Sequence, residues 1–203
     1  MSRYSIISIG ASAGGVEALI QLVQRLPSDL AASLLVVLHF PPDRASALPQ
    51  VLSRNSGLPA SHPQDGEAIQ PSHIYIAPPD HHLIVAPGCL HLNQDPPETG
   101  HRPAIDPLFR SVARVYGQQA IGVILSGTRE DGAAGLALIK SCGGVAIVQH
   151  PAEARFIGMP HHALQATPVD YVGKIVEIAT VLTSLVQDPI GEQPDRGVED
   201  SAG

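Results

Sequence analysis

The chain has 203 residues, 44% of them hydrophobic and 15% charged, and this composition indicates a globular protein rather than a disordered one. With 12 basic and 19 acidic residues the formal net charge is −7, which argues against a protein that tracks nucleic-acid phosphates. Two cysteines are too few for a disulfide scaffold or an all-cysteine zinc site, and 3% aromatic residues without tryptophan argue against base-stacking platforms.

The sequence contains no apolar run of about 18 residues, so it predicts no membrane-spanning segment. The polar start of the chain does not resemble a signal peptide, and with few cysteines this predicts a cytoplasmic location. Residues 188–203 carry five acids against one arginine and almost no apolar content. We therefore expect one folded domain at 1–187 and a disordered acidic tail at 188–203.

Short apolar runs alternate with helical patterns along the expected domain. The predicted elements, in chain order, are a strand at 5–9, a helix at 16–26, a strand at 34–38, a helix at 45–55, a strand at 73–77, a hairpin of 83–86 and 90–92, a helix at 106–116 with Asp106 as N-cap and Pro107 at N1, a strand at 120–125, a helix at 131–141, a strand at 145–149, and helices at 160–166 and 174–186. Apolar strands that each feed a helix are typical of a parallel sheet. The expected fold is a single doubly wound α/β domain, a mainly parallel sheet with helices on both faces and a small antiparallel hairpin.

The first predicted strand is followed by Gly10-Ala11-Ser12-Ala13-Gly14, which matches the pattern G-x-S-x-G at a strand-to-helix junction. In a nucleophile elbow the glycines permit the tight turn, the serine hydroxyl is exposed, and backbone N–H groups face a developing oxyanion. The same residues also suit a glycine-rich turn that starts a helix, or a phosphate-binding loop without chemistry. The motif alone leaves these alternatives open.

Two further polar residues follow predicted strands, where ligands of such sheets bind. His39 directly follows the second strand and is a candidate general base. Asp131 follows the strand at 120–125 and could orient that imidazole as the third member of a triad. Asp131 also sits where a helix begins, and the sequence alone favours the common role of N-cap over that of triad member. Glu130 is a rival carboxylate.

The remaining candidates are weaker. Arg102 could clamp a carboxylate or a carbonyl of a substrate, or lie in a surface loop. The adjacent pairs His81-His82 and His161-His162 do not face one way on a strand or helix, so we predict no metal site there.

Taken in order, these segments resemble the catalytic domain of the chemotaxis protein-glutamate methylesterases (CheB-type). The resemblance covers residues 4 to about 187 and is carried by IGASAGG at 9–15, HFP at 39–41, HRP at 101–103, GVILSG at 122–127, EDGAAG at 130–135 and FIGMP at 156–160. Several motifs in the right order are more specific than one G-x-S-x-G.

The resemblance implies a serine hydrolase with Ser12 as nucleophile, His39 as base and Asp131 as its orienter. It implies oxyanion donors at the backbone N–H groups of Ala13 and Thr128. The implied reaction demethylates glutamate γ-methyl esters, and deamidates glutamines, on the cytoplasmic helices of methyl-accepting chemotaxis receptors. It needs no cofactor and no metal. A separate receiver or methyltransferase protein is a further expected partner, whereas nucleic acid and membrane insertion are not expected.

The sequence departs from the family pattern in three ways. Ala13 stands where the family usually has threonine, and Gly127-Thr128-Arg129 stands where a glycine-methionine-glycine run is usual. The esterase motif starts at residue 9, so we expect a stand-alone enzyme without the receiver domain that usually precedes it. Three alternatives stay open: a small-molecule carboxylesterase, a nucleotide-binding module that uses Asp29 for a ribose, and an inactive member that only binds receptors.

Overall fold

The computed structural model describes residues 5–40 and 45–187. Its elements are β1 (Ile6–Ala11), α1 (Gly15–Val23), β2 (Ser33–Leu38), α2 (Leu48–Asn55), β3 (Ala60–Ser61), β4 (Glu67–Ala68), β5 (Ile74–Ile76), β6 (His82–Ala86), β7 (Cys89–Asn93), α3 (Ile105–Tyr116), the 3₁₀-helix η1 (Gly117–Gln119), β8 (Ala120–Ile124), α4 (Ala133–Ser141), β9 (Val145–Gln149), α5 (Gly158–Ala166), β10 (Tyr171–Gly173) and α6 (Ile175–Gln187). Within this part of the chain no helix is long and apolar enough to cross a membrane. The tail predicted at 188–203 lies outside it.

The described residues form one seven-stranded sheet with the order β10-β9-β8-β1-β2-β5-β3, and every pairing in it is parallel. The chain builds outward from β1 through β2, then returns to the other side of β1 at β8. The strand order therefore reverses between β1 and β8, and open α/β sheets bind their ligands at such a point.

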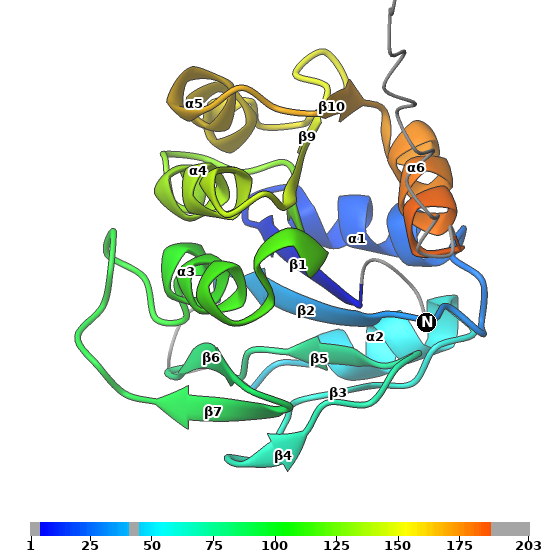
Figure 1. Cartoon of the computed structure of the whole chain (residues 1–203), viewed down its shortest axis with the longest axis vertical. Coiled ribbons are helices and arrows are strands. Elements are labelled where there is room, and N and C mark those ends of the chain that lie inside the picture. Colours follow the sequence, from blue (N-terminus) through cyan, green and yellow to red (C-terminus); the bar gives the residue numbers. More distant parts are fainter. Residues whose placement is uncertain (1–4, 41–44, 188–203) are drawn as a thin grey trace, which may run out of the picture.

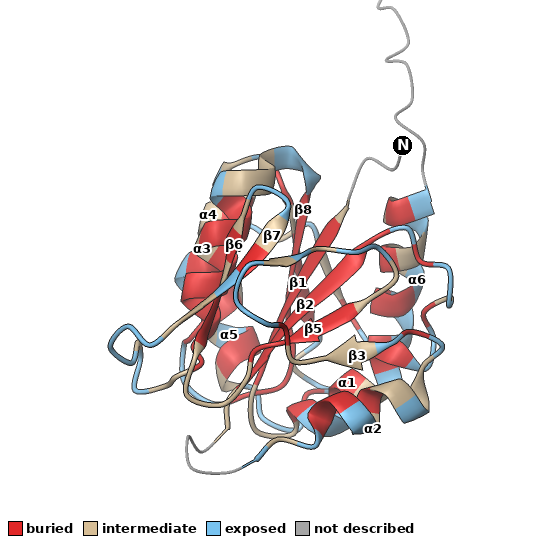
Figure 2. Ribbon diagram, turned by 90° about the horizontal axis from the view of Figure 1, so that it is seen from below, coloured by how far each residue is buried: buried red, intermediate tan, exposed pale blue. Residues whose placement is uncertain are grey.

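Helices cover both faces of this sheet (Figure 1). Helices α1, α2 and α6 pack on one face, and α3, α4 and α5 pack on the other. Successive residues of a strand point to opposite faces, so Ile7 and Ile9 join the first core while Ile6 joins the second. Strands β1, β2 and β8 are buried along their whole length (Figure 2), which explains their mostly apolar sequence. The hydroxyl of the buried Ser8 donates to the carbonyl oxygen of Ile121. The predicted doubly wound fold is confirmed.

The predicted hairpin is also confirmed, as β6 and β7, and it forms a separate small antiparallel sheet with β4. The sequence did not predict β3, β4 and β10, which have only two or three residues each. The helix predicted from residue 45 begins at Leu48.

The prediction of Asp106 as N-cap and Pro107 at N1 of its helix is wrong. Helix α3 begins at Ile105, and its N-cap residue Ala104 has no side chain that can accept a hydrogen bond. The carboxylate of Asp131 accepts from the backbone N–H groups of Ile105 and Asp106 instead. A residue far along the chain thus caps this helix, which local sequence patterns cannot reveal.

Candidate active site

The carboxyl ends of β1, β2 and β8 lie next to one another, because the register pairs Ala11 with Leu38 and Gly10 with Ile124. Ser12 directly follows β1 and His39 directly follows β2. The segment after β8 leads to Asp131. The sheet topology therefore brings the three predicted triad residues to one edge, at the point where the strand order reverses.

The turn between β1 and α1 presents Ser12 at this edge. The Ser12 backbone N–H donates to Ser126 O at 3.0 Å, and Gly15 N–H donates to Ser12 O at 2.8 Å. Gly14 caps α1 with a φ of 72°, a conformation that side chains disfavour. Opposite the serine, a Cβ on Gly127 would lie 2.9 Å from Ser12 Cβ. The elbow thus depends on a left-handed turn and on close backbone approach.

Ser12, His39 and Asp131 form a continuous hydrogen-bonded chain. His39 Nδ1 lies 3.1 Å from Ser12 Oγ, and His39 Nε2 lies 2.7 Å from Asp131 Oδ2. With the ring proton on Nε2, the serine hydroxyl donates to Nδ1 and Nε2–H donates to the carboxylate. The side chains of His39 and Asp131 are 5% and 0% exposed, whereas Ser12 is only half-buried. A substrate can reach the hydroxyl while the other two groups are shielded from water.

Asp131 is a buried carboxylate that accepts three hydrogen bonds, from His39 and from the backbone N–H groups of Ile105 and Asp106. Burial by itself would raise its pKa, but these hydrogen bonds and the nearby imidazole outweigh burial and lower it. Asp131 is therefore charged at neutral pH. It is not the N-cap of the helix it precedes, because that position belongs to Gly132.

The rival carboxylate Glu130 is exposed and forms no side-chain hydrogen bond with any described residue. The carboxylate that meets His39 is that of Asp131.

A second imidazole lies flat against His39. The ring centroids of His39 and His101 are 3.6 Å apart and their planes differ by 8°. His101 Nδ1 is buried, and no described residue is its hydrogen-bond partner. Burial lowers the pKa of His101 and the neighbouring His39 lowers it further, while Asp131 opposes both. Sequence reasoning gave His101 no role, although it begins the HRP motif at 101–103 that contributes to the family resemblance.

Arg102 is engaged away from the triad. Its Nε and Nη2 both donate to Asp80 Oδ1, at 2.9 and 2.6 Å, and its Nη1 donates to the carbonyl oxygens of Gln94 and Asp95. These bonds tie the segment that carries His101 to the loop before β6 and to the segment after β7. A direct contact between Arg102 and a substrate stays a prediction.

Ala13 and Thr128, the predicted oxyanion donors, belong to the two segments that meet at the serine. Ala13 follows Ser12 two residues before α1 begins, and Thr128 follows Gly127, which packs against Ser12. Among the described residues neither N–H has a hydrogen-bond partner. Ala13 lies just before the N-terminus of α1, a place where free N–H groups favour an anion. That the N–H groups of Ala13 and Thr128 meet an oxyanion stays a prediction.

Among the described residues, His39, His101 and Asp131 are the group whose ligand atoms lie close enough to share a metal ion, all within 4.8 Å of one another. A metal bound by an imidazole lies in the plane of the ring, because the nitrogen lone pair does. Two parallel rings stacked 3.6 Å apart share no such point. Both nitrogens of His39 are also engaged. The geometry therefore fits a hydrogen-bonded triad better than a metal centre.

The adjacent histidine pairs do not converge on a common point. His82 is buried, accepts from Ala104 N–H at Nδ1 and donates from Nε2 to Pro96 O. The rings of His161 and His162 meet edge to face at 6.0 Å. Neither pair therefore forms a shared ligand site among the described residues.

The sequence of residues 7–182 matches the family model described as CheB methylesterase. The chain belongs to the CheB methylesterase family. It is 37% identical over 183 residues to a protein-glutamate methylesterase/protein-glutamine glutaminase of Pectobacterium atrosepticum, which covers 88% of this chain and 52% of that protein. It is 32% identical over 191 residues to a protein of the same name from Methanosarcina mazei, covering 90% of this chain and 52% of the relative.

The fold matches a CheB structure as well. The crystal structure of the Thermotoga maritima CheB methylesterase catalytic domain aligns with a TM-score of 0.86 and 32% sequence identity, over 90% of this chain and 99% of that one. This chain spans about half the length of the curated relatives it matches. The family resemblance predicted from the sequence is confirmed.

Proposed function

We propose that this domain is a protein-glutamate methylesterase that also deamidates protein glutamines. The observation that carries the proposal is the continuous chain from Ser12 through His39 to Asp131 at the edge of the sheet where the strand order reverses. Relatives that match most of this chain are named for both reactions. The methyl ester and the side-chain amide are both acyl groups that a serine can attack.

In the proposed reaction Ser12 Oγ attacks the ester carbonyl carbon while its proton passes to His39 Nδ1. The imidazolium that forms is stabilised by the charged carboxylate of Asp131 at 2.7 Å. Collapse of the tetrahedral intermediate breaks the bond to methoxide, which takes the proton from His39 and leaves as methanol. Water then repeats these steps on the acyl-enzyme, which frees Ser12 and leaves a glutamate carboxylate.

We propose the backbone N–H groups of Ala13 and Thr128 as donors to the tetrahedral oxyanion. Their support is that neither has a hydrogen-bond partner among the described residues, and that Ala13 follows Ser12 while Thr128 follows Gly127, which packs against Ser12. A main-chain donor does not need the threonine or methionine side chains usual in the family. One oxyanion donor is worth about 10²–10³ in kcat, so the pair is a large part of the proposed catalysis.

The proposed substrates are the cytoplasmic helices of methyl-accepting chemotaxis receptors, which requires a cytoplasmic location. A separate receiver or methyltransferase protein is a proposed partner, and nucleic acid and membrane insertion are not. Arg102 is proposed as a substrate contact, and its bonds to Asp80 hold its guanidinium group in place. The nucleotide-binding alternative is weakened because Asp29 lies before β2, at the opposite end of the strands from the glycine loop.

The test is the variant Ser12→Ala with Ser141→Ala as its matched control, because Ser141 is an exposed serine at the end of α4. We expect Ser12→Ala to lower methanol release from methylated receptor membranes by about 10³-fold or more, as loss of a triad nucleophile does. The control should match the wild type.

Near-wild-type release by Ser12→Ala would refute the assignment. Hydrolysis of short acyl esters without any release from receptors would instead support a small-molecule carboxylesterase. Failure of a fluorophosphonate probe to label Ser12 in the wild type would indicate an inactive, receptor-binding member.

A further inference from the structure

We infer that His101 is a positioning residue for His39: its ring lies flat on His39 and holds the plane of the base in line with Ser12 and Asp131. The inference rests on the proposed function of Ser12 and His39. His101 has no hydrogen bond to Ser12 or to Asp131, so its role would be to contact the His39 ring.

The covalent bond to Cβ and two hydrogen bonds, from Nδ1 to Ser12 and from Nε2 to Asp131, define the plane of the His39 ring. The ring can leave this plane only by rotating about its side-chain bonds, which stretches both hydrogen bonds. A ring stacked at 3.6 Å with an interplanar angle of 8° blocks this rotation on one side. It also covers that face of His39, whose side chain is 5% exposed. His101 therefore adds a steric constraint to that of the hydrogen bonds.

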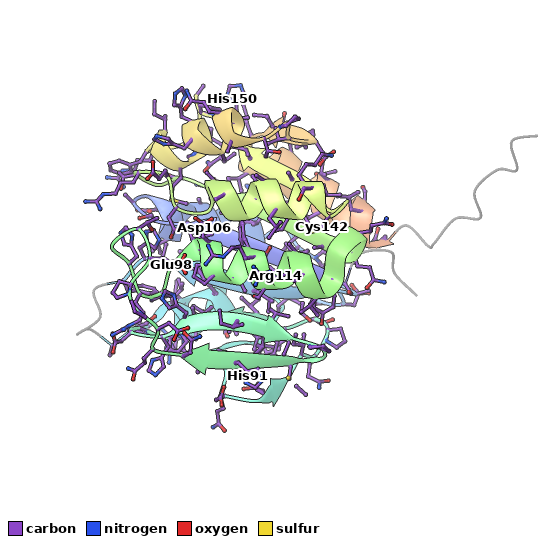
Figure 3. All side chains as sticks on the ribbon, turned by 60° about the vertical axis from the view of Figure 1, so that its left-hand side comes forward. His91, Glu98, Asp106, Arg114, Cys142 and His150 are labelled. Carbon is purple, nitrogen blue, oxygen red and sulfur yellow. The ribbon has the colours of Figure 1, made fainter. Side chains whose placement is uncertain are left out.

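His101 is itself held by the segment that leads into α3. Its backbone pairs with Glu98 through two hydrogen bonds of 3.1 and 2.8 Å, which closes a tight turn. The Glu98 carboxylate binds Arg110 of α3 at 2.6 and 2.8 Å. Figure 3 shows Glu98 and Asp106 at the same end of this helix. The helix that Asp131 caps therefore also anchors the turn that presents His101.

The surroundings of His101 favour its neutral form. A protonated ring would carry an N–H at Nδ1, which is buried without an acceptor. It would also place a positive charge beside His39 and near Arg129, opposed only in part by Asp131 and by the backbone of Thr99, which both favour the protonated ring. Burial and the proximity of His39 accordingly lower the pKa of His101. His101 can stack on the base without adding a charge that would oppose proton uptake by it.

Removing the ring has two expected effects. In His101→Ala the base can tip out of line, and we expect kcat to fall about three- to tenfold, in proportion to the usual strength of a stacked ring pair, with KM changed less than about twofold. Water then also reaches the open face and hydrates the imidazolium. The acidic limb of the rate profile, where the base is protonated, therefore moves to higher pH.

Two further variants separate positioning from space filling. His101→Phe keeps a flat ring without nitrogens, so we expect kcat within about twofold of wild type and an unmoved acidic limb. His101→Leu fills the space without a flat ring, so we expect the same fall in kcat as in His101→Ala. The matched control is His91→Ala, which removes a 48% exposed histidine on β7 of the small sheet (Figure 3) and should leave both readouts unchanged.

The measurements are methanol release from methylated receptors and the pH dependence of Ser12 labelling by a fluorophosphonate. Equal rates and pH profiles in His101→Ala, His101→Leu and wild type would overturn the inference, as would equal losses in His101→Leu and His101→Phe. The Leu and Phe pair decides the matter if the alanine variant does not fold. A wild type that labels but releases no methanol refutes the proposed substrate alone, because labelling still reports on His101. An unlabelled wild type overturns both proposals.

Discussion

Replacing Asp131 with asparagine preserves the size of the side chain but removes its charge and one acceptor oxygen. The carboxylate Oδ2 accepts from His39 Nε2 and from Ile105 N–H, both at 2.7 Å, and Oδ1 accepts from Asp106 N–H at 3.1 Å. An amide has one oxygen for these three donors. The substitution therefore tests orientation of the base and capping of α3 at the same time.

The side-chain amide can take either of two orientations, and each loses a different hydrogen bond of the site. With its NH₂ at the Oδ1 position, the Asp106 N–H loses its acceptor but His39 still donates from Nε2. With its NH₂ at the Oδ2 position, His39 must accept at Nε2, so its proton moves to Nδ1 and it can no longer accept from Ser12. In both orientations the imidazolium of the transition state lacks a negative partner.

The expected loss follows from this geometry. Leaving one member of a buried charge pair without its partner costs about 3–5 kcal/mol, and at about 1.4 kcal/mol per tenfold this lowers kcat/KM by about 10²–10⁴-fold. The orphaned backbone N–H lowers the free energy of unfolding by about 1–3 kcal/mol as well. Activity should therefore fall far more than the folded fraction does.

The assay is methanol release from methylated receptor membranes, with the free energy of unfolding measured in urea on the same samples. Glu130→Gln is the matched control, because it neutralises the adjacent but exposed carboxylate. It should stay within about twofold of wild type in both measurements. If Asp131→Asn keeps activity within about threefold of this control, Asp131 is only a helix cap and the triad assignment is wrong.

Two further substitutions test the support of the site. In Gly127→Ala the new Cβ would lie 2.1 Å from Met159 Sδ and 2.9 Å from Ser12 Cβ. We therefore expect Ser12 labelling by a fluorophosphonate to slow at least about tenfold. An unchanged rate would mean that the close packing of Gly127 does not determine the position of the Ser12 side chain. Burial and the nearby Asp131 raise the pKa of Asp106 although Gly135 N–H opposes this, so ionising Asp106 destabilises the fold as pH rises through that pKa. Asp106→Asn should therefore gain about 2–4 °C in melting temperature over wild type at neutral pH and lose this gain in acid, and a gain that is equal at both pH values would contradict the reasoning.

The sequence predicted best those elements whose burial is uniform. Strands such as β1 and β8 are covered on both faces, so each appears as a short segment without charged residues and with few polar ones. Strands β3, β4 and β10 are too short to produce a pattern, and their pairing depends on neighbours far along the chain. The predicted fold class followed from the long buried strands alone.

For the site, the rule that ligands gather after parallel strands placed Ser12, His39 and Asp131 at one edge. It could not reveal which carboxylate meets the imidazole, since Glu130 and Asp131 are adjacent and only their side-chain directions differ. Nor could it predict that His101 would stack on His39, because that contact depends on a turn held by an ion pair with α3. Contacts set by tertiary packing leave no local signal in the sequence.

The Asp131 carboxylate accepts hydrogen bonds both from His39 and from the first residues of α3, and this has a consequence for how the family evolves. A lineage that stops needing ester hydrolysis can exchange Ser12 or His39 without disturbing the start of α3, but it cannot exchange Asp131 so freely, because two amides of that helix depend on its oxygens. An aspartate retained at this position in a related sequence is thus poor evidence that the sequence still encodes a working hydrolase. The serine and the histidine are the informative positions.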